Sequence, residues 1–146
     1  MTDLSLFKHR TEIAVRYGDI DMLRHVNNAK YLTYLEQARV QYAYDVLQWD
    51  GNWDTLNMIL ARVEVDFRQP IFIHDRIAIY SRVSRLGNKS FDMEYVFVRN
   101  NNLADIAGQA KAVLVAYDTV QMRSHPLPEV MRMRIMEHEK EGLAKD

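Results

Sequence analysis

The chain has 146 residues, 48% of them hydrophobic and 27% charged, with a formal net charge of −1. These values predict one ordinary globular domain over residues 1–146, and they argue against a disordered, membrane-spanning or nucleic-acid-binding protein. The sequence has no cysteine and no apolar run long enough for a signal peptide. We therefore expect a cytoplasmic protein with neither nucleic acid nor membrane as a partner.

The first expected elements are a strand and a long helix. In TEIAVRY (residues 11–17), alternate apolar residues share one face, which indicates a half-buried strand. From Asn28 to about Leu47, apolar residues recur at steps of three and four, which indicates a helix. The expected buried stripe consists of Tyr31, Leu32, Leu35, Ala38, Arg39, Tyr42 and Val46. Either Asn27 or Asn28 can cap the helix, since the asparagine oxygen accepts hydrogen bonds from first-turn amides.

Strand patterns dominate the remaining chain. After a loop in QWDGNWDTLN, alternation predicts strands over residues 59–68, 75–86, 90–99 and 103–117. Gly87-Asn88 and residues 100–102 supply turns. Two prolines then precede a short mixed-charge helix that we expect to be exposed. A long helix followed by antiparallel strands predicts an α+β fold, with the helix against a curled antiparallel sheet.

A polar cluster, YGDIDMLRHVNN, lies between the first strand and the helix. Asp and Asn are common in turns and helix caps, so a purely structural role is one interpretation. A phosphate-transferring DxD motif of the haloacid dehalogenase type is disfavoured, because Leu23 replaces a hydroxyl residue and the strands are not parallel. A calcium loop is disfavoured because Leu23 and Arg24 occupy positions that need an oxygen ligand and a glycine. We predict no metal site.

Acyl transfer is a third interpretation of the cluster. Thioester cleavage needs a nucleophile or a general base, together with donors aimed at the developing oxyanion. Asp21 stands about seven residues before the helix, whose first amides are unpaired donors at the positive end of the helix dipole. His25 could orient the substrate or assist proton transfer.

The segment VRYGDIDMLRHVNNAKYLTYLEQAR closely resembles the N-terminal signature of hotdog-fold acyl-CoA thioesterases of the 4-hydroxybenzoyl-CoA thioesterase-like group. RVEVDFRQPIFIHDRIAIYSRV and GQAKAVLVAYD resemble later strands of that group. The resemblance covers roughly residues 11–131. It implies a hotdog fold, a long central helix wrapped by a curled antiparallel sheet, which assembles as a homodimer or homotetramer with active sites at subunit interfaces.

The resemblance also implies roles for individual residues. Asp21 corresponds to the catalytic aspartate, acting as nucleophile or general base, and Asn28 supplies the backbone amide that stabilises the oxyanion. Asp19 is expected to serve structure. In related plant acyl-carrier-protein thioesterases the loop reads D-x-N-x-H-V-N-N, and here Leu23 replaces the asparagine beside His25. The role of His25 is therefore open. Another branch keeps its carboxylate on the helix, where this chain has Glu36.

The implied reaction is hydrolysis of an acyl-CoA to a carboxylic acid and coenzyme A, without a cofactor other than the substrate's own coenzyme A moiety. The phosphates of coenzyme A need basic partners, and Arg85 and Lys89 flank the Gly87-Asn88 turn. Tyr31 is a candidate for contact with the acyl group. Further candidates for this pocket are Tyr34, Leu35 and Met58. Two alternatives stay open: a non-catalytic acyl-binding protein and a thioesterase that acts on acyl-carrier protein.

Overall fold

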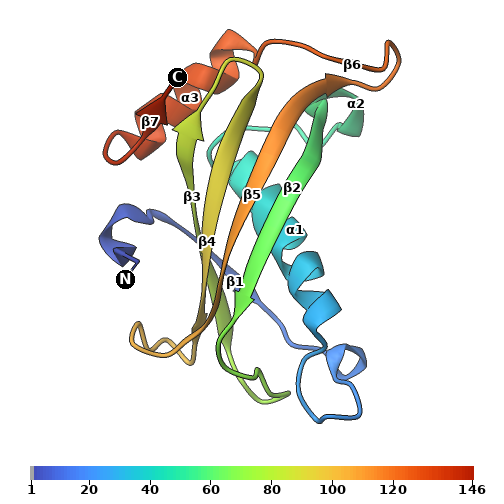
Figure 1. The fold of residues 1–146 in the computed structure, drawn as a ribbon, viewed down its shortest axis with the longest axis vertical. Coiled ribbons are helices and arrows are strands. Elements are labelled where there is room, and N and C mark those ends of the chain that lie inside the picture. Colours follow the sequence, from blue (N-terminus) through green and yellow to red (C-terminus); the bar gives the residue numbers. More distant parts are fainter. Residues whose placement is uncertain (1) are drawn as a thin grey trace.

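The structure is a computed structural model that describes residues 2–146, and a curled antiparallel sheet with one long helix dominates it (Figure 1). In chain order the elements are η1 Leu4–Leu6, β1 His9–Ile13, η2 Tyr17–Asp19, α1 Asn28–Asp45, α2 Trp53–Leu56, β2 Met58–Phe67, β3 Ile77–Leu86, β4 Ser90–Arg99, β5 Ile106–Asp118, β6 Arg123–Ser124, α3 Glu129–Glu139 and β7 Ala144–Lys145. The expected α+β class and the strand and helix types are confirmed.

The main sheet has the strand order β1-β3-β4-β5-β2, and each neighbouring pair in that order is antiparallel. The register shifts between Leu60 and Arg62 in β2 and between Val83 and Arg85 in β3. Such bulges bend a strand and increase its twist, which helps the sheet to curl. The order ends at β2, so this strand forms one edge of the sheet.

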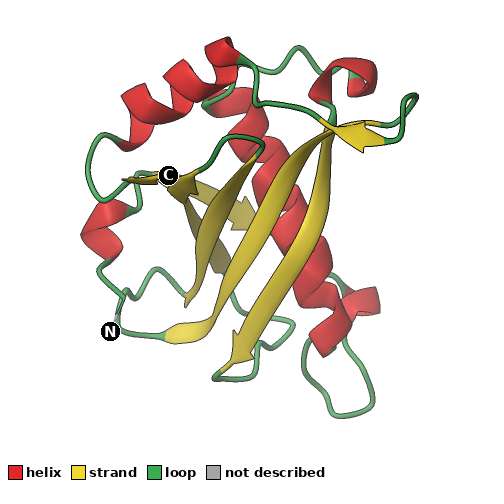
Figure 2. Cartoon of the chain, turned by 45° about the horizontal axis from the view of Figure 1, so that its top comes forward, coloured by secondary structure: helices red, strands yellow, loops and turns green. Residues whose placement is uncertain are grey.

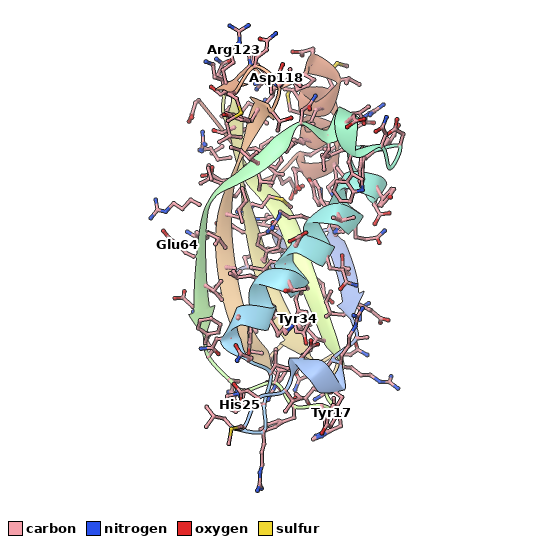
Figure 3. The ribbon with its side chains drawn as sticks, turned by 90° about the vertical axis from the view of Figure 1, so that its right-hand side faces the viewer. Tyr17, His25, Tyr34, Glu64, Asp118 and Arg123 are labelled. Atoms are coloured by element: carbon pink, nitrogen blue, oxygen red, sulfur yellow. The ribbon has the colours of Figure 1, made fainter. Side chains whose placement is uncertain are left out.

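Helix α1 lies on the concave side of the sheet, which wraps around it with β1 on one side and β2 on the other (Figure 3). Leu35 and Ala38 on the helix and Ile79 and Phe97 on the sheet are completely buried. Burial of each of the three larger side chains, Leu35, Ile79 and Phe97, contributes about 1.5–3 kcal/mol. The Tyr31 ring packs against Phe97, with the two ring centroids 5.0 Å apart. Helix and sheet therefore hold each other in place.

The C-terminal helix α3 covers one end of the sheet (Figure 2) and is anchored by a buried carboxylate. Oε1 of Glu139 accepts hydrogen bonds from the Tyr42 hydroxyl at 2.6 Å and from the Val83 amide at 2.8 Å. Ile135 is also completely buried. The prediction of an exposed terminal helix was thus wrong for the face of α3 that carries Ile135 and Glu139. The α3 sequence has no apolar stripe that could have revealed this buried face.

Three further predictions need correction. The expected loop in QWDGNWDTLN contains the short helix α2, which Asn52 caps by accepting a hydrogen bond from the Asp54 amide. β1 ends at Ile13 instead of Tyr17, which is 90% exposed. The chain turns there because the Asp19 carboxylate accepts a hydrogen bond from the Arg16 amide at 3.0 Å, closing the η2 turn. On α1, Leu32 is 45% exposed, whereas Tyr34 is buried. The periodic pattern therefore located the buried face of α1 correctly overall. It did not show which residues at the border of that face are buried.

None of the helices in residues 2–146 combines the length and the hydropathy needed to cross a bilayer.

Candidate active site

The loop from Ile20 to Asn27 joins η2 to α1 and is held by backbone hydrogen bonds. Ile20 and Val26 form an isolated antiparallel bridge, and within it the Asp21 amide donates to the His25 carbonyl at 3.2 Å. The Val26 amide donates to the Ile71 carbonyl at 2.8 Å, which ties the loop to the segment before β3. At the tip, Arg24 has a φ of 70°, the left-handed conformation that closes the turn. This loop is a fixed platform for Asp21.

Asp21 uses only one of its two carboxylate oxygens in hydrogen bonds within residues 2–146. Its Oδ1 accepts a hydrogen bond from the Leu23 amide at 2.8 Å. Its Oδ2 accepts no hydrogen bond from residues 2–146, and the residue is partly exposed. A carboxylate that is oriented through one oxygen and free at the other can act on a substrate or a water molecule.

The start of α1 leaves one backbone donor unused. Asn27 is the cap: its Oδ1 accepts from the Ala29 amide at 2.9 Å, and its carbonyl accepts from the Lys30 amide at 2.8 Å. Within the described chain the Asn28 amide has no hydrogen-bond acceptor. It lies at the positive end of the helix dipole, where an anionic oxygen is stabilised. Of the two predicted caps, Asn27 is therefore the one observed.

Asp19 lies beneath the loop and links it to the helix. It is 8% exposed, and its Oδ2 accepts from the Tyr34 hydroxyl at 2.5 Å and from the Arg16 amide. Burial acts to raise the pKa of Asp19, but these hydrogen bonds and the nearby charges of Lys30 and Arg16 hold that pKa below its ordinary value. Burial and the hydrogen bond to Asp19 together raise the pKa of Tyr34. This pair of side chains supports the structural role expected for Asp19.

His25 is half-buried at the same end of the molecule as Tyr17 (Figure 3). Its Nδ1 lies 3.4 Å from the Val26 carbonyl, which is too long for a strong hydrogen bond. Asp21 and His25, both in the described part of the chain, do not form an ion pair with each other. Any part that His25 plays in chemistry stays a prediction.

Of the three residues predicted to bind substrate, Arg85 and Lys89 lie far from this loop within one copy of the chain (Figure 1), whereas Tyr31 lies in the first turn of α1. The hairpin with Arg85 and Lys89 joins β3 and β4 at the opposite end of the sheet (Figure 1). Asp92 already binds the Arg85 guanidinium through both oxygens, at 2.8 and 3.0 Å, and Asp146 pairs with it as well. Tyr31 is 2% exposed and belongs to the core. Their contacts with substrate stay predictions.

A cavity that was not predicted from the sequence lies between α1 and β2. Its volume is about 270 Å³. Its apolar lining includes Val40, Ala43, Leu47, Met58, Leu60 and Met93, and its charged lining residues are Glu36 and Arg39. Met58 was expected at an acyl pocket. The signal that could have revealed the cavity is Arg39, a charged residue within the expected buried stripe of the helix.

A metal centre is not apparent in residues 2–146, where no group of three or more His, Asp or Glu side chains converges in a metal-binding arrangement. The predictions of no metal and no separate cofactor stay predictions.

Comparison with known proteins links this geometry to one family. The sequence model of the thioesterase-like superfamily matches residues 15–135. A segment of 91 residues is 32% identical to the long-chain acyl-CoA thioesterase FadM of Escherichia coli, covering 56% of this chain and 62% of FadM. Another segment is 23% identical to the uncharacterized protein YsmA of Bacillus subtilis, covering 62% of this chain and 60% of YsmA. The chain thus matches less than two thirds of either relative's length.

Solved structures give longer matches. A thioesterase of Thermus thermophilus, complexed with coenzyme A and Zn, is 34% identical and superimposes with a TM-score of 0.79 over 90% of this chain and 93% of its own. The PA2801 protein of Pseudomonas aeruginosa is 28% identical, with a TM-score of 0.79 over 87% and 97% of the two chains. The curled sheet around one helix is the hotdog fold of such thioesterases.

Proposed function

Because the chain belongs to the thioesterase-like superfamily, we propose that it hydrolyses acyl-CoA thioesters to a carboxylic acid and coenzyme A. The observation that carries the proposal is the pairing, within one short loop, of a carboxylate with a free oxygen at Asp21 and an unpaired first-turn amide at Asn28. Both parts of an acyl-transfer site then lie on a segment that backbone hydrogen bonds hold in place. Membership of the narrower 4-hydroxybenzoyl-CoA branch is part of the proposal.

The reaction follows from these two groups. Asp21 either removes a proton from the water that attacks the thioester carbonyl, or attacks that carbon itself to form a mixed anhydride that water then hydrolyses. In both routes the carbonyl oxygen becomes negative and is stabilised by the Asn28 N–H at the positive end of α1. The carbon–sulfur bond then breaks, and coenzyme A leaves as a thiolate. Single turnover in ¹⁸O-labelled water distinguishes the routes, because only the anhydride route can label Asp21.

Self-association through β2 is part of the same proposal. This edge strand has ten residues and carries exposed apolar side chains, among them Ile59 at 38% and Phe67 at 48%. A long, apolar strand edge is normally covered, and a second copy of the chain covers it symmetrically. In Figure 3, Glu64 lies about midway along β2, so antiparallel pairing of two β2 strands centres a two-fold axis near this residue.

Such pairing joins opposite ends of the two copies. Tyr17 and His25 lie at one end of the molecule and Asp118 and Arg123 at the other (Figure 3). Exposed apolar side chains occur at both ends: Tyr17, Met22 and Leu23 at the first, and Trp53, Val120 and Met122 at the second. The α1–β2 cavity belongs to the second end, since Met58 pairs with Ala116 near the end of β5. The cavity of each copy would therefore face the Asp21 loop of the other copy and receive the acyl tail.

The test is release of free thiol from short-chain, long-chain and aromatic acyl-CoA esters by the wild-type protein and by Asp21→Asn. We expect hydrolysis of at least one ester, with the long-chain esters the first candidates by similarity to FadM. The variant should be slower by about 10²-fold or more. Asp54→Asn, an exposed aspartate on α2, is the matched control and should keep the wild-type rate.

Two results would contradict the proposal. Equal rates for wild type and Asp21→Asn would remove Asp21 from the mechanism. Binding without thiol release from any ester would favour the acyl-binding alternative, and release from acyl-carrier protein alone would favour the third candidate.

A further inference from the structure

We propose that residues 50–56 form a lid on the α1–β2 cavity, which stays closed over medium-length acyl chains and is displaced by longer ones. The inference rests on the proposed thioesterase function and names the chain lengths that the same site distinguishes. The segment contains α2, which lies at the end of the sheet where β2 begins (Figure 1). Its hydrogen bonds, its backbone conformation and its contacts with the cavity carry the argument.

The lid is held together by its own hydrogen bonds. The Asp50 carboxylate accepts from the Asn52 amide at 2.9 Å and from the Thr55 hydroxyl at 3.0 Å. The Asn52 carbonyl accepts from Nε1 of Trp49 at 2.9 Å. Among the described residues, none outside 49–56 forms a hydrogen bond with residues 50–56. The segment can therefore move as one unit without breaking hydrogen bonds to the rest of the fold.

A residue in the left-handed conformation stands on each side of the lid. Gln48 has a φ of 54° and Asn57 has a φ of 42°, values that are uncommon for residues other than glycine. The chain is anchored at the same two places. The Trp49 amide donates to the Ala43 carbonyl on α1 at 3.0 Å, and the Asn57 carbonyl accepts from the Tyr117 amide on β5 at 2.9 Å. Hinge motions are absorbed by a few loop residues of this kind, so the lid has a hinge at each fixed end.

Two side chains of the lid, Trp53 and Leu56, line the cavity. Leu56 is partly buried and packs against the core. Trp53 is 64% exposed, and its ring contacts that of Trp49 with the centroids 4.7 Å apart. The other walls include the buried apolar side chains Ala43, Leu47, Phe91 and Met93. An acyl chain in the cavity would cover part of the exposed Trp53 ring, and this burial of apolar surface would stabilise the closed lid.

The volume of the cavity indicates how much of an acyl chain fits beneath the closed lid. An apolar protein cavity of about 150 Å³ holds benzene, which has six carbons. By the same measure the cavity of about 270 Å³ found here holds about eleven carbons. A decanoyl chain therefore fits with the lid closed, whereas a palmitoyl chain is longer than the closed cavity accepts. The end of the longer chain would displace Trp53 and open the lid.

The two tryptophans of the sequence, Trp49 and Trp53, provide a direct probe of the lid. Acrylamide quenching of their fluorescence reports how exposed this segment is, with no contribution from another tryptophan and no need for catalysis. The measurement compares decanoic and palmitic acid, each at the saturating concentration found by calorimetry. We expect decanoic acid to lower the quenching constant of the wild-type protein and palmitic acid to raise it above the value without ligand. Equal protection by the two acids would overturn the inference, and so would a response to neither.

A substitution in the lid tests its effect on substrate choice. Trp53→Ala removes the ring that a long chain would have to displace, so the ratio of kcat/KM for palmitoyl-CoA to that for decanoyl-CoA should rise by about tenfold. Trp53→Phe should restore part of the wild-type ratio. Leu103→Ala, at a residue that is 53% exposed in the β4–β5 turn, is the matched control and should keep that ratio. An unchanged ratio in Trp53→Ala would overturn the inference. If neither ester is hydrolysed, the proposed function fails, while the quenching measurement still decides whether the lid exists.

Discussion

The Tyr34 hydroxyl donates a hydrogen bond to Oδ2 of Asp19 across 2.5 Å, and this contact joins α1 to the loop that carries Asp21. Tyr34 is 3% exposed and Asp19 is 8% exposed, so water does not replace the bond easily. The loop with the candidate catalytic carboxylate and the helix with the candidate oxyanion donor are therefore held in one geometry by a pair that takes no part in the reaction.

Removal of the Tyr34 hydroxyl should loosen this joint. We expect Tyr34→Phe to lower the free energy of unfolding by about 1.5–3 kcal/mol, because a buried carboxylate loses a hydrogen bond. If the Tyr34–Asp19 hydrogen bond positions Asp21, the variant should also have a lower kcat. Urea denaturation and thiol release measure the two effects. Tyr44→Phe, at a tyrosine that is 46% exposed, should change neither.

The ionisation of Asp19 should make stability depend on pH. Its folded-state pKa lies below the ordinary value of 3.8, so the stabilisation is present above that value and is lost as the pH falls through the folded-state pKa. The free energy of unfolding of the wild-type protein should therefore fall more steeply below about pH 4 than that of Asp19→Asn. Parallel curves for the two proteins in urea titrations at several pH values would contradict the assignment.

The oxyanion role of Asn28 belongs to its backbone amide, and two substitutions separate backbone from side chain. Asn28→Ala should keep most of the activity, because the N–H remains. Asn28→Pro removes the N–H at the first helical position, where proline is well tolerated, and the extended Asn27 (φ −60°, ψ 136°) is compatible with a following proline. We expect a loss of about 10²–10³ in kcat with near-wild-type stability. Similar rates for the two variants would exclude the amide from catalysis.

The β2 edge should determine the oligomeric state. Ile59 is 38% exposed in one copy, so Ile59→Lys should change the free energy of unfolding of the monomer only slightly. The same substitution places a charge in the proposed β2–β2 interface. We expect a shift from dimer to monomer in analytical ultracentrifugation, with reduced thioesterase activity because each site would lose the other copy's cavity. Leu103→Lys, at an exposed residue of the β4–β5 turn, is the control. A wild-type protein that is monomeric at all concentrations would contradict the proposed assembly.

Local patterns in the sequence predicted the elements well. Apolar residues repeat every three to four positions from Asn28 onward and every second position over Ser90–Arg99, and these patterns located α1 and β4. They do so because helices and strands each repeat their side-chain direction at a characteristic interval. The asparagine pair located the helix start, since a cap depends only on neighbouring residues. The errors at Tyr17 and Leu32 came from particular side-chain contacts and from packing, which a periodic pattern does not contain.

The sequence by itself therefore determined the fold class, the order of helix and strands, and the loop in which Asp21 and Asn28 stand close together, since all of these depend on short-range periodicity and capping. Only the tertiary structure decided that Asn27 takes the cap and leaves the Asn28 amide free, that Tyr34 holds Asp19, and that the α1–β2 cavity forms beside Arg39. The physical reason is that hydrogen-bond satisfaction and burial depend on groups brought together from distant parts of the chain by the closing of the sheet around α1.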